Sequence, residues 1–193
     1  MEEAIYLKMK RAMNNGMNLS ERDWGVFRIS DLFSLTTGAN IDKSLLRKGT
    51  TPRITAKDTC NGIDSYTSEL NINTYRTNKN CISVSFLGSV YYQPYRASYD
   101  MKIHSLVPKG ITLNRYIGFF LATVLRIQFS KFSYGNQLSS TDLPKQNIML
   151  PVCPDGTPDW AYMVQKSKYI EKKILLTYFN CKMPAPKSSE DTT

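Results

Sequence analysis

Three groups of residues in this 193-residue sequence combine cationic, amide and aromatic side chains at close spacing. The first contains Tyr91, Tyr92, Gln93 and Arg96, and the second contains Lys131, Tyr134, Asn136 and Gln137. The third places Arg53 and Lys57 beside an Asn-Gly turn at Asn61. Lysine and arginine neutralise phosphates, arginine pairs with guanine, and asparagine and glutamine pair with adenine. The three groups therefore predict contacts with double-stranded DNA.

Each of these residues, taken singly, also has an ordinary structural explanation. Tyrosine suits half-buried strands, and asparagine and glycine suit turns. The charge distribution favours binding for the groups together. The chain carries 25 lysines and arginines against 16 acids, a net +9, and the segment 24–150 holds fifteen of the bases and seven of the acids. The excess charge thus belongs to the central segment, and an anionic partner is indicated.

The sequence lacks the common motifs of catalysis and metal binding. It contains no phosphate-binding loop, no H-E-x-x-H, and neither the glycine-rich nor the Asn/Asp-Pro-Pro-aromatic motif of an adenine methyltransferase. Asp159, Glu171 and Lys173 match a nuclease pattern formally, but on one helix the two carboxylates would lie roughly 18 Å apart, too far to share a metal ion. With one histidine, His104, and four widely spaced cysteines, we expect no metal, no cofactor and no catalysis.

Hydrophobic periodicity predicts an α+β fold: a mixed, strongly twisted β-sheet with a buried helix, followed by a C-terminal spacer or assembly helix. The expected strands cover residues 24–29, 53–56, 80–87, 90–95, 101–107 and 147–150. A single helical turn, capped by Ser30 and Asp31, is expected at 32–33. The buried helix is expected at 113–132. No stretch is long and apolar enough to span a bilayer, and no secretory signal is evident, so we expect a cytoplasmic protein.

The chain divides into four predicted segments: an N-terminal helix and lead-in at 1–23, a DNA target-recognition domain at 24–152, a helix at 158–180 and a disordered tail at 182–193. The N-terminal helix shows apolar residues at helical spacing and ends at an Asn-Asn-Gly sequence; these residues are Ile5, Met9, Ala12 and Met13. The C-terminal helix has a stripe of roughly three heptads that includes Trp160, Met163, Ile170 and Ile174. Packing on its own domain and packing against another molecule explain this stripe equally well.

Several short motifs follow one another in an order that resembles a known family. They are W-G-V-F-R-I-S-D-L-F at 24–33, Gly38, G-T-T-P-R-I-T at 49–55 with Asn61-Gly62, the apolar strand before Gly88, F-S-Y-G-N-Q-L at 132–138, and I-M-L-P-V at 148–152. The chain resembles the target-recognition domain of specificity (S) subunits of type I restriction-modification systems, which is also used in related type IIG enzymes. The likeness covers residues 24–152, about two thirds of the chain.

This resemblance implies a non-catalytic role in sequence-specific DNA recognition. Such domains clamp duplex DNA and present it to a methyltransferase (M) subunit that modifies adenine, and to a restriction (R) subunit where one exists. The helix that follows the domain is the family's spacer and docking element. This chain has one recognition domain and a short spacer, so it is either a half-subunit that forms a homodimer through that helix or a piece of a longer subunit. A different hypothesis is an interaction or inhibitor module that binds an acidic protein through the basic face.

Overall fold

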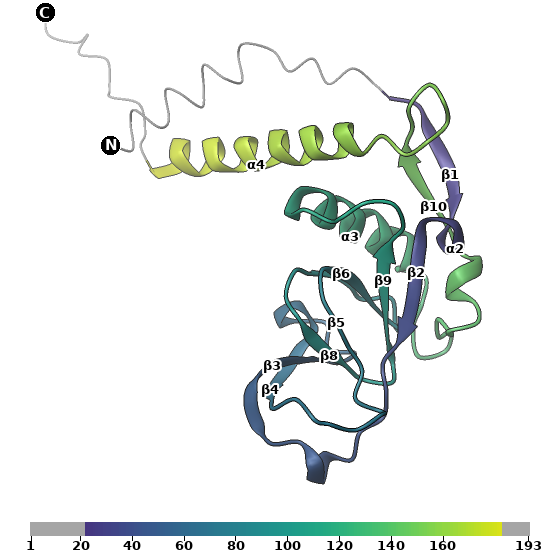
Figure 1. Cartoon of the computed structure of the whole chain (residues 1–193). Helices are drawn as coiled ribbons and strands as arrows, with labels where there is room; N and C mark the ends of the chain where they lie inside the picture. The colour runs from purple at the N-terminus through teal and green to yellow at the C-terminus, as the bar shows by residue number, and fades with distance from the viewer. Residues whose placement is uncertain (1–21, 183–193) are drawn as a thin grey trace, which may run out of the picture.

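The computed structural model describes residues 22–182, and Figure 1 shows their arrangement. The helix expected at 1–23 and the tail expected at 182–193 lie almost entirely outside the described residues. The strands are β1 (Trp24–Arg28), β2 (Phe33–Thr37), β3 (Lys48–Ile54), β4 (Ile63–Thr67), β5 (Thr77–Asn78), β6 (Cys81–Ser85), β7 (Val90–Gln93), β8 (Ala97–Tyr99), β9 (Ile103–Pro108) and β10 (Asn147–Pro151). The helices are α2 (Ile29–Leu32), α3 (Arg115–Phe129) and α4 (Trp160–Lys182).

The described strands form three sheets rather than the single sheet expected. One four-stranded sheet has the order β2-β9-β6-β7 and is antiparallel throughout. The other has the order β4-β3-β8-β5, and its β3–β8 pair is parallel. β1 pairs with β10 in a separate antiparallel ribbon, with Trp24 opposite Pro151. The α+β class and the mixed strand directions agree with the prediction.

Helix α3 covers the antiparallel sheet and forms the main core with it (Figure 1). The side chain of Asn114 caps the helix by accepting hydrogen bonds from the backbone nitrogens of Tyr116 (3.0 Å) and Ile117 (3.1 Å). Gly118 lets the helix approach β7 closely, because a Cβ atom there would lie 2.6 Å from the ring of Tyr92. The prediction of a well-buried helix holds for one face only, because Phe119 and Ile127 are exposed.

The short turn after β1 begins earlier than expected. Ser30 and Asp31 were predicted to cap a turn at 32–33, but α2 starts at Ile29 and has no side-chain cap. The backbone nitrogen of Ile29 instead donates to the carbonyl of Gln146 (2.9 Å), and the Ile29 side chain is fully buried. Phe33 is then free to begin β2. A tertiary contact therefore satisfies the first backbone donor of this turn, where no side chain caps it.

Helix α4 follows β10 and lies along α3 at one end of the domain (Figure 1). Asp159 begins it by accepting a hydrogen bond from the backbone nitrogen of Tyr162 (2.8 Å). Met163 is fully buried in the main core, whereas Ile170 and Ile174 are 45% and 62% exposed. The predicted stripe is thus divided between the chain's own core and an open surface. Between residues 22 and 182, no helix is long and apolar enough to cross a membrane.

Candidate nucleic-acid interface

The hairpin that joins β6 to β7 brings together charged and aromatic residues from distant parts of the chain. On one side of it, Arg126 of α3 forms an ion pair with Asp58 (Nη2–Oδ1, 3.0 Å), and the Tyr91 hydroxyl donates to the same oxygen (3.1 Å). The Arg126 guanidinium also lies 5.5 Å from the centroid of the Tyr91 ring. Hydrogen bonds from Ser89 and Tyr91, together with the positive charge of Arg126, lower the pKa of Asp58.

On the other side of the hairpin, Phe86 lies between a lysine and a tyrosine. The Lys102 ammonium lies 4.4 Å from the centroid of the Phe86 ring. Tyr134 meets that ring edge-on, with centroids 6.4 Å apart, and its own side chain is 80% exposed. The backbone nitrogen of Leu138 donates to the Phe86 carbonyl (2.8 Å), which anchors the 131–137 loop to the hairpin.

We call these two clusters, together with Lys57 beside Asp58, the hairpin face. Its members are Lys57, Asp58, Phe86, Tyr91, Lys102, Arg126 and Tyr134. A hollow of about 650 Å³ adjoins the face and shares Lys57 and Lys102 with it. Lys43 and Arg53 also line this hollow, together with Asp64 and Asp100, so four cationic and two acidic side chains border it. A surface that is basic, aromatic and partly concave is suited to a polyanion.

The group predicted at 131–137 is exposed and borders the hairpin face through Tyr134. The side-chain amides of Asn136 and Gln137 donate long hydrogen bonds to the carbonyls of Lys131 and Tyr134, both at 3.4 Å. The Lys131 ammonium donates to Gln146 Oε1 (3.0 Å). The two amide side chains are therefore free to turn toward a ligand. Their predicted contact with DNA bases remains a prediction.

The structure brings Asn61 and Gln93 of the other two predicted groups together in a partly buried network. Asn61 Nδ2 donates to Gln93 Oε1 (3.1 Å), and Gln93 Nε2 donates to the carbonyl of Asn61 (2.9 Å) and to Ser83 Oγ (3.0 Å). Asn61 also donates to the hydroxyl of Tyr95 (2.9 Å). Asn61 has a positive φ of 57° and Gly62 one of 76°, as an Asn-Gly turn requires. This network fixes the turn against β7.

Burial corrects the expected exposure of three residues in the predicted DNA-facing set. Gln93 is fully buried, and Arg53 and Tyr92 are 4% and 7% exposed. Gln93 uses its amide to hold the Asn61 turn, and Tyr92 packs under Gly118 and donates to Asn80 Oδ1 (2.9 Å). Arg53 forms an ion pair with Asp100 (2.9 Å). These three side chains therefore hold the surrounding backbone in place and are not available to contact DNA.

The remaining members of the predicted set have different surroundings. Lys57 is exposed, and Tyr91 is half-buried on the hairpin face. Arg96 is exposed but follows β7 at the end away from the hairpin, where it pairs with Glu69 (2.8 Å). The structure thus does not bring Arg96 into the hairpin face.

Sequence reasoning missed three members of the hairpin face: Phe86, Lys102 and Arg126. Phe86 looked like an ordinary strand residue, and Lys102 stood alone near the start of the strand predicted at 101–107. Arg126 lies in an apolar helix far along the chain from its partner Asp58, so no local pattern could join them. The available signal was a charged side chain inside an otherwise apolar helix, which must face solvent or a partner.

The nuclease pattern has a structural explanation. Asp159 caps α4 and pairs with Arg22 (3.6 Å), while Glu171 lies twelve residues further along the same helix and pairs with Arg115 (2.8 Å). In the part of the chain that the structure describes, no three histidine, cysteine or acidic residues could hold a metal ion. His104 is buried in β9 and hydrogen-bonds Thr37 Oγ1 (3.0 Å), and burial lowers its pKa.

Comparison with known families decides the classification of this chain. A family model described as the type I restriction modification DNA specificity domain matches residues 21–177. The chain belongs to this family. The match includes the whole hairpin face and most of α4. The family defines a DNA specificity domain and not a catalytic one.

Similar proteins agree with this family membership. The chain is 29% identical over 178 residues to the specificity subunit S.BcgI of a type II restriction enzyme from Heyndrickxia coagulans. That alignment covers 91% of this chain and 51% of the relative, so the chain spans about half the length of the curated relative it matches.

Two solved structures share the fold. The S subunit of a type I restriction-modification system from M. genitalium is similar with a TM-score of 0.55 and 16% identity, over 86% of this chain and 40% of that one. The HsdS subunit from Thermoanaerobacter tengcongensis is similar with a TM-score of 0.55 and 12% identity, over 96% of this chain and 48% of that one. The α+β fold expected from the sequence is thereby confirmed.

Proposed function

We propose that this chain reads part of a double-stranded DNA sequence for a restriction-modification system, as a specificity subunit or half of one. The observation that carries the proposal is the family match over residues 21–177. The hairpin face supports it, because its cations are placed to contact phosphates beside exposed aromatic and amide side chains. In this proposal Lys57, Lys102 and Lys131 bind the DNA backbone, while Asn136 and Gln137 read base edges.

The chain would direct other proteins rather than act on DNA itself. We propose that it places a DNA adenine methyltransferase subunit, and a nuclease subunit where the system has one, at the recognised site. The name of the similar S.BcgI subunit, which belongs to a restriction enzyme, supports such an assembly. The alternative of an inhibitor that binds an acidic protein through the same face finds no support in the family.

The test is selection from a random duplex library, with the purified chain alone and then with the methyltransferase encoded beside it. Enrichment of a defined motif is expected in at least one of the two experiments. Binding that is equal for all sequences and falls with salt would mean that the face is merely basic, and it would reject sequence reading.

We also propose that the distal part of α4 serves in assembly, including a homodimer of half-subunits. Ile174 and Tyr178 are exposed on this part of the helix, 62% and 56%, and the apolar stripe continues there. Of the four residues first assigned to the assembly stripe, Trp160 and Met163 pack on the chain's own core. Light scattering should give the mass of a dimer, and Tyr178→Asp should give the monomer. A monomeric mass for the unmodified chain would exclude the homodimer.

A further inference from the structure

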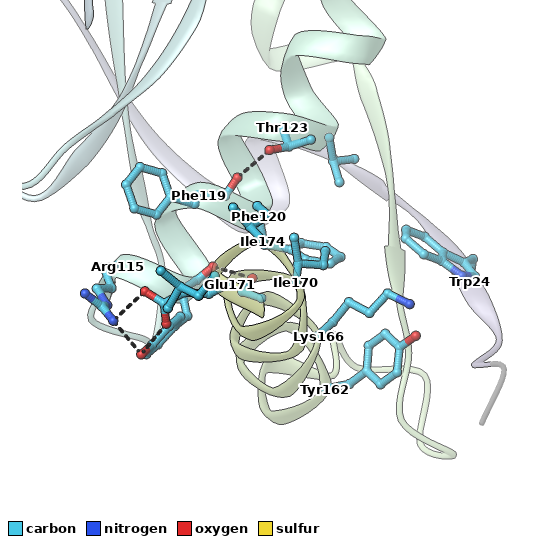
Figure 2. A pocket seen from close by; sticks show the side chains of 14 residues that line it. Trp24, Arg115, Phe119, Phe120, Thr123, Tyr162, Lys166, Ile170, Glu171 and Ile174 are labelled. Atoms are coloured by element: carbon cyan, nitrogen blue, oxygen red, sulfur yellow. Dashed lines mark hydrogen bonds and ion pairs between the residues drawn. The ribbon is translucent and has the colours of Figure 1, made fainter. Parts of the chain in front are cut away.

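An apolar groove lies between α3 and α4, outside the hairpin face (Figure 2). Its volume is about 520 Å³. Phe119, Phe120, Ile170 and Ile174 line it, together with Trp24 of β1. Phe119, Ile170 and Ile174 are each at least 45% exposed. A contiguous exposed surface of large apolar side chains marks a contact site, because leaving it in water forgoes the free energy of burial.

The chain enters the described structure at the wall of this groove. Trp24 stacks on Phe120, with ring centroids 6.3 Å apart and an interplanar angle of 22°. Two residues earlier, Arg22 lies 3.6 Å from Asp159 at the start of α4, and its guanidinium lies 5.8 Å from the Tyr162 ring. Tyr162 itself lines the groove. The point where the preceding 21 residues join the domain is therefore fixed beside one end of the groove.

We propose that residues 2–13 of this same chain fill the groove as an amphipathic helix. Their apolar positions follow helical spacing, and the sequence Asn14-Asn15-Gly16 ends the pattern. A helix of twelve residues is about 18 Å long, which equals the length of α4 from Tyr162 to Ile174 at the same rise per residue. The stripe that would face the groove consists of Ile5, Met9, Ala12 and Met13.

The connection between this helix and the domain is long enough for the chain to turn back. Residues 14–21 span up to roughly 26 Å when extended, more than the length of the helix. Such a short tether also gives the segment an effective concentration on the order of millimolar at the groove. Docking by the chain's own segment therefore needs only a modest intrinsic affinity.

Charge favours this occupant over a second copy of α4. Helix α4 carries five lysines and one glutamate, so a second copy laid against the first would bring five more lysines. Residues 2–13 carry Glu2 and Glu3 against three bases, a net +1, and both acids stand at the beginning of the segment. Docked along the groove, these two acids would lie near the distal turns of α4, where Lys172 and Lys173 stand. The docked segment would leave Tyr178 open for the assembly proposed above.

Disulfide trapping tests the proposal in the full-length chain. The background would carry Cys60→Ser, Cys153→Ser and Cys181→Ser, which leaves only the buried Cys81. One variant adds Met9→Cys and Lys166→Cys, because both residues lie about 6 Å along their helices from the end of the groove at Tyr162 and Lys166 lines the groove. The matched control adds Arg11→Cys and Lys166→Cys, because Arg11 lies about 200° around a helix from Met9. Both variants are oxidised under the same mild conditions and examined by non-reducing electrophoresis and mass.

The expected result is a disulfide within one chain that forms at least tenfold faster with Met9→Cys than with Arg11→Cys. Equal rates for the two variants would show that the segment passes the groove without docking by this face, and would overturn the proposal. A covalent dimer as the main product of Met9→Cys would assign the groove to a neighbouring molecule and would also overturn it. DNA binding plays no part in the readout, so the outcome is independent of the function proposed above.

Discussion

Two regions of this domain each carry an asparagine, a glutamine and tyrosines, and they use them in opposite ways. Asn61 and Gln93 bond each other in a closed network, and Gln93 is fully buried. Asn136 and Gln137 lie exposed in a loop, and their side-chain amides donate hydrogen bonds of 3.4 Å to carbonyls. The first pair holds a turn in place, and the second pair is available to a ligand.

The difference arises from what lies opposite each pair. Gln93 ends β7, whose neighbour β6 places Ser83 within hydrogen-bonding distance, while the Asn61 turn covers it from the other side. The 131–137 loop follows α3 and is fixed to the hairpin only at Leu138. The amide groups of asparagine and glutamine can bind DNA bases, and they can equally satisfy the backbone hydrogen-bonding groups of a buried turn. Composition alone therefore cannot separate a reading residue from a supporting one.

The largest expected effect comes from breaking the buried pair. Gln93→Ala removes one hydrogen-bond partner each from Asn61 and Ser83 and opens a small cavity, so the free energy of unfolding should fall by about 3 kcal/mol. The same substitution at Gln137, an exposed site, should change it by less than about 0.5 kcal/mol. Urea unfolding of both variants measures this. Similar losses in the two variants would contradict the division drawn here.

The exposed pair should affect binding and not stability. Asn136→Ala or Gln137→Ala should weaken binding to the preferred DNA sequence by about 1–3 kcal/mol and leave binding to unrelated duplexes unchanged. Fluorescence anisotropy with the selected motif and with a scrambled duplex distinguishes the two effects. A loss that is equal on both duplexes would show that the residue does not read bases.

The cations of the hairpin face should act through the salt dependence of binding. Lys102→Ala should reduce the slope of log K against log salt by about 0.9 if it neutralises one phosphate, with the same change for any duplex. Lys79→Ala is a matched control, because Lys79 is exposed just before β6, at the end away from the hairpin. If both variants changed the slope alike, the binding surface would extend well beyond the hairpin face.

The smallest effect concerns His104, beneath the two regions. Burial lowers its pKa below the usual value of 6.5, so the folded chain binds this proton less readily than the unfolded chain. Its contribution to stability is therefore complete above pH 6.5 and is lost as the pH falls below that value, by at most about 1.4 kcal/mol per pH unit. Urea unfolding of the unmodified chain and of His104→Gln between pH 5 and pH 8 measures it. An identical pH dependence in both would assign the effect to other groups.

Much of the fold was predictable from the sequence, because apolar periodicity and turn chemistry act locally. The strand at β1, the Asn61-Gly62 turn and the helices α3 and α4 were all expected near their observed positions. Strands β2, β4, β5 and β8 were not, because they are short and their residues are mostly polar. Their pairing depends on partners far along the chain, which no local pattern contains.

The candidate site was predictable in its chemistry but only partly in its members. Lys57, Tyr91 and Tyr134 reach the hairpin face, whereas Arg53 and Gln93 turn inward. Arg53 was indistinguishable from an exposed arginine until Asp100 was placed beside it, 47 residues along the chain. Arg126 was not predicted as a site residue, because its partner Asp58 lies in a distant segment of the chain.

The pairing of β1 with β10 has a consequence for how such proteins diversify. Trp24 faces Pro151 across this ribbon, so the chain comes into the recognition domain and goes out of it at the same place. Loops between these strands can therefore change in length or sequence while the position from which α4 departs stays the same, provided that the contacts between α3 and α4 are kept. We expect that such changes alter the DNA contacts of the domain without redesign of the helix that follows it.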